Sequence, residues 1–458
     1  MTDVPATFDL ETLQWAYRER DITPRAVVET ALSRAESDES RNVWIDRYDE
    51  RARRRAADLA SVDPAEYPLY GVPFAVKDNI DVAGRPTTAA CPAYEYVPED
   101  SATVVERLAD AGAVLLGKTN MDQFATGLVG TRSPYGICRN AHDRSLISGG
   151  SSSGSGVAVA RGQVSFALGT DTAGSGRVPA ALNGVVGYKP TRGLVSTDGV
   201  VPACRTLDCV SVFATTVADA ARVGDLLVGY DDADPYSRPE ADGLSVTGTA
   251  RDTPTIGVFE RTEHFGDDAA RTLFEKAVRG VEDAGATVVT VPEAPFREAA
   301  ELLYGGPWVA ERFSAVGDFL EDHPDEALDV TRDIITEGAD YSAVDSFEAM
   351  YALQERRRRV QAVFEDVDFL LTPTTGTTYT VDAVREAPKE TNATLGHYTD
   401  YVNLLDLCAV AVPGGTRPDG AHLGVTLVGP ADHDASTLSV ADRLVPEDCR
   451  SVPTRTDE

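Results

Sequence analysis

The chain has 458 residues, of which 42% are hydrophobic, and its formal net charge of −32 gives a pI near 4.5. This length allows one large α/β domain or two to three smaller ones, and the mean hydropathy of −0.20 is that of a soluble globular protein. The strong negative charge argues against nucleic acid and anionic membranes as partners, because phosphates are repelled. Only five of the 42 cationic residues are lysines, and this combination is typical of salt-adapted proteins with a carboxylate-rich surface.

The N-terminal part, residues 1–66, is predicted to be helical, because Leu10, Leu13, Ala16 and Tyr17 recur at helical spacing. From about residue 67, short apolar runs alternate with glycine-rich turns and helical stretches, which predicts an α/β layered sheet with helices on both faces. The apolar runs are 73–76, 113–116, 164–168 and 184–186, and the clearest helical stretch is 102–111.

The second half of the chain begins with a predicted surface loop at 231–254, which is rich in Asp, Pro, Gly and Ser. Further on, strands are predicted at 255–259, 286–291, 369–373 and 424–427, with a helix at 267–284 and a helical block at 297–365. We therefore expect a single discontinuous α/β domain over residues 67–445, followed by an acidic tail at 446–458.

The cysteines and histidines predict neither a metal site nor a bound cofactor. None of the six cysteines forms a C-x-x-C pair, and the six histidines do not cluster with them at metal-ligand spacing. The N-terminus lacks a basic-then-apolar signal, and no apolar run approaches the ~20 residues of a membrane span. A cytoplasmic protein with reduced thiols is the expectation.

Lys77 is unusual because it ends an apolar run, G-V-P-F-A-V-K-D-N, in a chain that otherwise prefers arginine. Arginine cannot lose its proton in a protein, whereas a buried lysine can become neutral and act as a base. A base of this kind needs a nucleophile, and two segments rich in glycine and serine provide candidates.

The first segment, S-G-G-S-S-S-G-S-G at 148–156, has several interpretations. Its apolar flanks argue against a flexible linker, and it lacks the G-K-[ST] ending of a phosphate loop. It spells G-x-S-x-G around Ser152, as in a hydrolase nucleophile elbow, although the preceding residues 140–147 are too polar for the strand that such an elbow needs. A purely structural turn remains open.

The second segment, G-T-D-T-A-G-S-G-R at 169–177, surrounds Ser175 with small residues. Such residues let the backbone bend so that consecutive N–H groups converge, which a tetrahedral oxyanion requires. Asp171 is positioned to stabilise the turn by accepting backbone hydrogen bonds. An ordinary turn between strand and helix would also explain the glycines.

These segments, with Lys77 in V-P-F-A-V-K-D-N, resemble the amidase signature family over about residues 66–445. The two serines that match the family, Ser151 and Ser175, are 24 residues apart (175 − 151), as in the family, which selects Ser151 over its neighbours Ser152 and Ser153. The resemblance implies a large, mixed, twisted β-sheet flanked by helices on both faces.

The resemblance also implies a Ser–cis-Ser–Lys triad. Ser175 would be the nucleophile, Ser151 would relay its proton to a neutral Lys77, and the reaction would pass through an acyl-enzyme. The implied oxyanion hole consists of the backbone N–H groups of Thr172, Ala173, Gly174 and Ser175, with Asp171 and Arg177 as structural support.

Within the family, residues 199–213, 304–312 and 398–408 resemble allophanate hydrolase. That resemblance implies that Tyr304 and Arg312 bind the carboxylate end of the substrate, with Gly127 as a further substrate-binding residue. A guanidinium and a phenol can hold a carboxylate by charge-assisted hydrogen bonds. Without the resemblance, an ion pair for Arg312 and a core position for Tyr304 are the alternatives.

The expected substrate is therefore allophanate, a small amide from urea degradation, and a homodimer is implied. Long allophanate hydrolases carry an extra C-terminal domain, whereas this chain stops 28 residues after Pro430 (458 − 430). The second step is then expected to be spontaneous, absent or performed by a separate protein, and urea carboxylation would need a separate urea carboxylase.

Other functions remain as alternatives. They are the glutaminase (A) subunit of a tRNA-dependent amidotransferase, which needs partner subunits, and a broad-specificity amidase. Residues 171–177, D-T-A-G-S-G-R, depart from the D-T-G-G-S-[IV]-R wording common in both groups. A non-catalytic descendant would predict a broken triad, but all three members are present.

Overall fold

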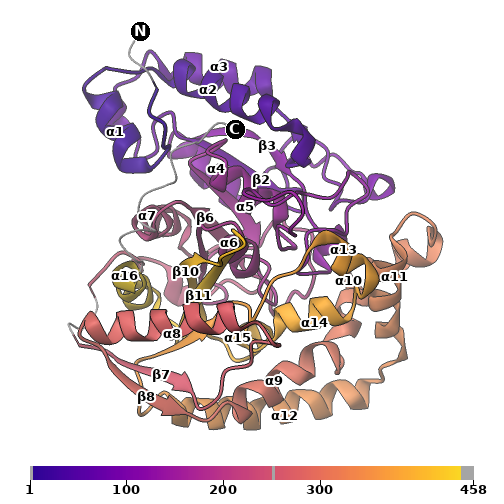
Figure 1. The fold of residues 1–458 in the computed structure, drawn as a ribbon. Helices are drawn as coiled ribbons and strands as arrows, with labels where there is room; N and C mark the ends of the chain where they lie inside the picture. Colours follow the sequence, from indigo (N-terminus) through magenta and orange to yellow (C-terminus); the bar gives the residue numbers. More distant parts are fainter. Residues whose placement is uncertain (1–3, 250–252, 445–458) are drawn as a thin grey trace.

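The computed structural model describes residues 4–249 and 253–444, and the predicted acidic tail at 446–458 lies outside this range. Within the described residues, eleven strands form one mixed sheet in the order β1-β3-β2-β4-β6-β5-β10-β11-β9-β7-β8 (Figure 1). The strands are β1 Trp44–Arg47, β2 Pro73–Lys77, β3 Val114–Thr119, β4 Phe166–Thr170, β5 Val186–Lys189, β6 Val210–Ala214, β7 Thr255–Phe259, β8 Thr287–Val291, β9 Phe369–Pro373, β10 Cys408–Thr416 and β11 His422–Gly429.

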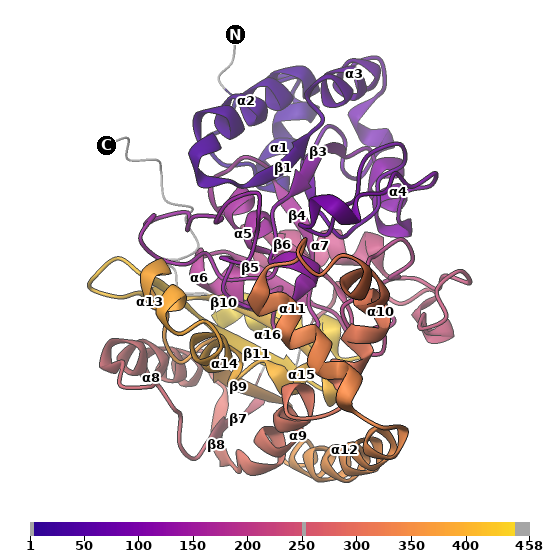
Figure 2. The same cartoon turned by 90° about the vertical axis from the view of Figure 1, so that its right-hand side faces the viewer.

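Helices surround this sheet, and its first and last strands are covered by different groups of them. The helices are α1 Leu10–Arg18, α2 Pro24–Ser37, α3 Asp49–Leu59, α4 Thr103–Asp110, α5 Ser153–Ala160, α6 Arg177–Leu182, α7 Val217–Leu227, α8 Asp268–Asp283, α9 Ala294–Tyr304, α10 Trp308–Asp322, α11 Asp329–Thr336, α12 Ala343–Val363, α13 Val381–Glu386, α14 Glu390–Gly396, α15 Asp400–Leu404 and α16 Asp434–Leu444. Figure 2 shows α1–α3 at the β1 end of the sheet, and both figures show α9 and α12 near β7 and β8 at the other end. No helix in the described ranges is long and apolar enough to cross a membrane.

Strand β2, which ends at Lys77, contributes residues to two hydrophobic layers, one on each face of the sheet. It runs parallel to both β3 and β4, and all five of its residues are buried, as expected for a strand covered on both faces. Phe74 and Val76 pack into a cluster with residues of α4, α7 and α16, whereas Ala75 packs into a second cluster with residues of α2, α3 and α5. This alternation follows from the two-residue period of a strand.

The predicted mixed α/β sheet with flanking helices is confirmed. The strands expected at 255–259 and 369–373 match β7 and β9, and the helical block at 297–365 contains most of α9 and all of α10–α12. The N-terminal region is not wholly helical, because β1 pairs antiparallel with β3. β1 has only four residues, W-I-D-R, which do not alternate between apolar and polar, so no sequence pattern predicts a strand there.

Candidate active site

Lys77 is the last residue of β2 and lies on the same side of the strand as Ala75, facing α5. Its side chain is fully buried, with 0% of its surface exposed. Lys77 Nζ lies 2.7 Å from Ser151 Oγ and 2.7 Å from Thr170 Oγ1, the last side chain of the neighbouring strand β4. The ammonium or amine of Lys77 therefore has two hydroxyl partners and no carboxylate partner within the described chain.

This environment favours the neutral amine. Burial lowers the pKa of Lys77 to about 7, although the more distant carboxylates of Asp122, Asp208 and Asp171 oppose the shift. A base with a pKa near neutrality is half deprotonated where it has to work, which is the condition for efficient general-base catalysis.

Ser151 belongs to a buried loop that leads into α5. The Gly150–Ser151 peptide bond is cis, and Asp122 N donates to Ser151 O (3.0 Å). The next residue, Ser152, is also fully buried, and its hydroxyl donates to Thr170 O (3.1 Å) and accepts from Thr170 N (3.2 Å). The hydroxyl of Ser152 is thus already engaged with the backbone of β4.

The loop that carries Ser175 is organised by Asp171. Asp171 Oδ1 accepts from Gly174 N (2.8 Å), and Oδ2 accepts from Gly176 N (3.1 Å) and Arg177 N (3.2 Å). The Arg177 guanidinium adds two bonds of 2.9 Å in a fully buried pair. Although burial opposes ionisation, this guanidinium keeps the pKa of Asp171 below its usual value.

The backbone of this loop leaves donors unused. Among the described residues, the N–H groups of Thr172, Ala173 and Ser175 have no hydrogen-bond acceptor. Gly174 N–H differs, since it is already bonded to Asp171. Three of the four N–H groups assigned to an oxyanion from the sequence are therefore available. Ser152 N donates to Ser175 O (3.3 Å), which joins the two serine loops.

Gly174 shows why this loop requires glycine. Its φ of +119° disfavours side chains, and an added Cβ would lie 2.3 Å from Thr399 Oγ1. Thr399 in turn donates to Ala173 O (2.7 Å), and Arg177 Nη2 donates to Thr399 O (3.2 Å). The segment before α15 therefore fixes the position of the Ser175 loop.

Tyr304 is the last residue of α9 and meets Arg312, which lies in the second turn of α10. Arg312 is 3% exposed, and its guanidinium makes only long bonds, to Thr126 Oγ1 (3.2 Å), Ala125 O (3.4 Å) and Tyr304 OH (3.4 Å). Its guanidinium carbon lies 5.4 Å from the centre of the Tyr304 ring. Arg312 forms no ion pair with any residue of 4–249 or 253–444.

Gly127 follows the two residues that bond Arg312. A Cβ at Gly127 would lie 2.8 Å from Asp122 Oδ2, so the close approach of Asp122 requires glycine here. Asp122 accepts from the backbone N–H groups of Val129 (3.2 Å), Gly130 (3.0 Å) and Arg132 (2.8 Å). This carboxylate therefore shapes the loop on which Gly127 lies.

Two cavities lie near these residues, and their charges differ. One, of about 330 Å³, is bordered by Tyr304, Arg132, Arg297, Asn392 and Asp400, among others; we call it the Tyr304 cavity. The other, of about 360 Å³, is lined by Asp81, Asp198, Asp208 and Asp234 with Arg205 as its single cation.

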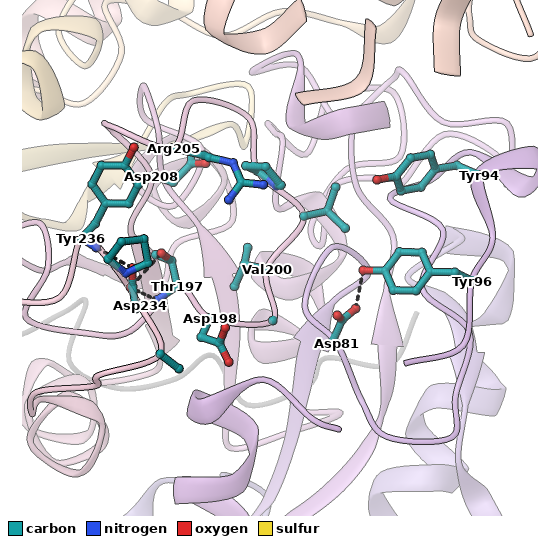
Figure 3. Close-up of a pocket in the computed structure, with 15 residues that line it drawn as sticks. Asp81, Tyr94, Tyr96, Thr197, Asp198, Val200, Arg205, Asp208, Asp234 and Tyr236 are labelled. Atoms are coloured by element: carbon teal, nitrogen blue, oxygen red, sulfur yellow. Dashed lines mark hydrogen bonds between the residues drawn. The ribbon is translucent and has the colours of Figure 1, made fainter. Parts of the chain in front are cut away.

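Figure 3 shows the second, acidic cavity, with Tyr96 and Asp81 on one side and Tyr236 and Asp234 on the other. The acidic cavity adjoins the Ser175 loop, because Thr172 Oγ1 in that loop donates to Asp208, which lines the cavity (2.5 Å). Four carboxylates around one cavity repel an anion, so an anionic ligand is better accommodated beside Tyr304.

Sequence reasoning did not find Thr170, Asp122 or Asp208. Thr170 and Asp208 lie in the segments 169–177 and 199–213, but nothing local in the sequence gives either a role. Each of the three residues acts through a tertiary contact: Thr170 with Lys77, Asp122 with Ser151 O and Asp208 with Thr172. The one available signal was that Thr170 and Asp171 come directly after the apolar run 164–168 and Gly169, which indicates that they lie at the end of a strand.

Comparisons with known proteins are consistent with this geometry. A family described as amidase matches residues 26–438. The urea amidolyase of Saccharomyces cerevisiae is 48% identical over 379 residues, which cover 82% of this chain and 20% of that protein. The A subunit of the glutamyl-tRNA(Gln) amidotransferase of Natronomonas pharaonis is 36% identical over 412 residues, covering 82% of this chain and 96% of that protein.

Among solved structures, the allophanate hydrolase of Kluyveromyces lactis superposes with a TM-score of 0.89 at 42% identity. The match covers 95% of this chain and 72% of that one. In contrast, the chain spans about a fifth of the length of the urea amidolyase that it matches.

Proposed function

The chain belongs to the amidase family, and from that premise we propose that it releases ammonia from allophanate, a small amide that carries a carboxylate. Two similar proteins, the urea amidolyase of Saccharomyces cerevisiae and the allophanate hydrolase of Kluyveromyces lactis, support this choice of substrate by the activities for which they are named.

The observation that carries the proposal is the buried guanidinium of Arg312, which forms no ion pair within residues 4–249 and 253–444. A buried charge without a counter-ion is costly, so such a group is retained where a ligand supplies the opposite charge. Arg312 is 3% exposed and has only hydroxyl and carbonyl partners, all at 3.2 Å or more. A substrate carboxylate is the anion that would pair with it, and the Tyr304 hydroxyl would donate a further hydrogen bond.

We assign the chemistry to Ser175, Ser151 and Lys77. Ser175 Oγ attacks the terminal amide carbon, and its proton passes through Ser151 Oγ to the neutral amine of Lys77. The C–N bond then breaks, and the leaving nitrogen takes this proton and departs as ammonia. Water next attacks the acyl-enzyme by the same proton route, which frees Ser175 and releases the dicarboxylated amine.

The developing oxyanion would be stabilised by the free backbone N–H groups of Thr172, Ala173 and Ser175. Fixed donors in a buried site stabilise such a charge without reorganisation. Gly174 N–H would instead maintain the loop through its bond to Asp171 (2.8 Å).

The rival activity is glutamine hydrolysis, because the Natronomonas pharaonis protein matches over 96% of its length. The two are separated by assaying ammonia release from allophanate, glutamine and propionamide side by side, in high and low salt. We expect allophanate to give by far the highest kcat/KM. A preference for glutamine, or no ammonia from allophanate, would overturn the proposal.

The assembly of the protein stays a prediction. A homodimer, a separate urea carboxylase and a separate protein for the second step follow from the sequence resemblance alone. Sedimentation of the purified chain would test the first of these directly.

A further inference from the structure

The Tyr304 cavity contains a carboxyl group that the proposed chemistry does not use. Asp400 is the first residue of α15 and borders the cavity together with Tyr304. It directly follows Thr399, whose hydroxyl bonds Ala173 O (2.7 Å) in the Ser175 loop. Asp400 is therefore fixed to the segment that holds the nucleophile loop.

The Asp400 carboxyl has an oxygen that no hydrogen bond of the described residues satisfies. Its Oδ1 is buried, and within the described chain it accepts no hydrogen bond. Two other carboxyl groups near the site have hydrogen-bond donors. Asp171 accepts two hydrogen bonds from the Arg177 guanidinium, and Asp208 accepts from Thr172 and from the backbone of Ala203 and Cys204. Other buried polar atoms of the described chain also lack a partner, but Asp400 borders a cavity, where a ligand could supply the missing hydrogen bond.

Charged groups from several elements act on Asp400. It is attracted electrostatically by Arg297 on α9, Arg177 on α6 and Arg312 on α10, and repelled by the carboxylate of Asp171. Arg297 is bonded to His397 O (2.7 Å), and Lys389 and Glu337, which also border the cavity, pair with each other (3.2 Å). The remaining titratable groups that border the cavity are Arg132, Glu301 and Tyr304.

Burial determines the protonation state of Asp400. It raises the pKa of Asp400 to about 8, against the attraction of Arg297, Arg177 and Arg312. At neutral pH the group is mainly a carboxylic acid, with one O–H donor that an ionised aspartate lacks.

We propose that Asp400 is a specificity-determining residue, which donates a hydrogen bond to the carboxylate end of the substrate and repels that carboxylate once it ionises. The inference deepens the proposed function and rests on it. The acid would complete a binding site in which Arg312 supplies the charge and Tyr304 a second hydroxyl donor.

This role predicts a particular pH dependence. With an ionisation near pH 8, the KM for allophanate should rise about tenfold between about pH 7 and pH 9, as the acid form is depleted. Lys77, with a pKa of about 7, becomes more fully neutral over this range, which favours turnover rather than weakening substrate binding. Burial raises the pKa of Tyr304 above its usual value of 10.0, so neither group accounts for a rise in KM. The KM for propionamide, which has no carboxylate, should stay constant.

The test compares Asp400→Asn with the wild type in steady-state kinetics from about pH 6.5 to pH 9.5. The asparagine amide keeps a donor but cannot ionise, so its KM for allophanate should change less than about twofold over this range. Asp400→Leu, which has no donor, should raise the KM at every pH. A tenfold rise that persists in Asp400→Asn, or that also appears for propionamide, would overturn the assignment.

Binding separates this inference from the proposed function. Malonamate, in which CH₂ replaces the central NH of allophanate, can be titrated by calorimetry into Ser175→Ala protein at about pH 7 and pH 9. Binding should weaken about tenfold at the higher pH, and the loss should vanish in Ser175→Ala/Asp400→Asn. If binding weakens equally in both proteins, the role of Asp400 is refuted, whether or not the wild type hydrolyses allophanate. If the wild type is inactive on allophanate, only the proposed function is refuted.

Discussion

Replacing Lys77 by methionine should stabilise the fold at neutral pH while abolishing activity. The drop of its pKa from 10.5 to about 7 means that the folded state disfavours the ammonium by about 5 kcal/mol. Methionine removes this penalty and fills similar space. It also leaves the Ser151 hydroxyl and, in part, the Thr170 hydroxyl without a partner, at a cost of about 2 kcal/mol together. The net gain is about 3 kcal/mol.

The sign of the pH dependence follows from the direction of this shift. A lysine whose pKa is lowered by folding destabilises the protein fully below about pH 7, and the penalty fades as the pH rises toward 10.5. The advantage of Lys77→Met should therefore shrink between about pH 7 and pH 10. Urea unfolding of both proteins at several pH values, at constant salt, measures this difference.

Lys118→Met is a matched control. Burial lowers the pKa of Lys118 as well, but its ammonium lies 3.6 Å from the buried carboxylate of Asp78, so its loss leaves that carboxylate without its ion-pair partner. This variant should be destabilised at neutral pH by about 3 kcal/mol or more. If Lys77→Met is less stable than the wild type at about pH 7, or if its advantage does not vary with pH, the argument for a neutral Lys77 fails.

Two further predictions concern turnover. Because Lys77 must be neutral and has a pKa of about 7, kcat for propionamide should rise about tenfold from about pH 6 to pH 8; a flat profile would contradict a lysine base. Arg312→Ala should lower kcat/KM for allophanate by about 30-fold to 1000-fold, the value of lost charge-assisted hydrogen bonds, and that for propionamide by less than about fivefold. Equal losses on the two substrates would remove the carboxylate-binding role of Arg312.

The sequence could predict the parts of this molecule that depend on local pattern. β2 is an apolar run, and Lys77 was identifiable because a lysine ends that run in a chain with few lysines. The Ser175 loop was identifiable because its small residues and Asp171 together form a local turn. The Asp171 carboxylate accepts hydrogen bonds from the backbone of that turn.

What the sequence could not predict depends on contacts between distant segments. The pairing of β1 with β3 joins segments about seventy residues apart, and β1 has no apolar pattern of its own. Arg312 could have been an ion pair or a ligand contact, and only the folded surroundings reveal that it lacks a carboxylate partner in the described chain. Likewise, only the folded structure reveals that Asp400 Oδ1 has no hydrogen-bond partner among the described residues.

The central claim is that Ser175 is the nucleophile of an allophanate-hydrolysing amidase with Lys77 as its base. Ammonia release from allophanate by the purified wild type, Ser175→Ala, Lys77→Arg and the control Ser153→Ala tests it most directly. We predict turnover by the wild type and by Ser153→Ala, and losses of about a thousandfold or more in the other two. Substantial turnover by Ser175→Ala or by Lys77→Arg, whose arginine cannot accept a proton, would contradict the claim.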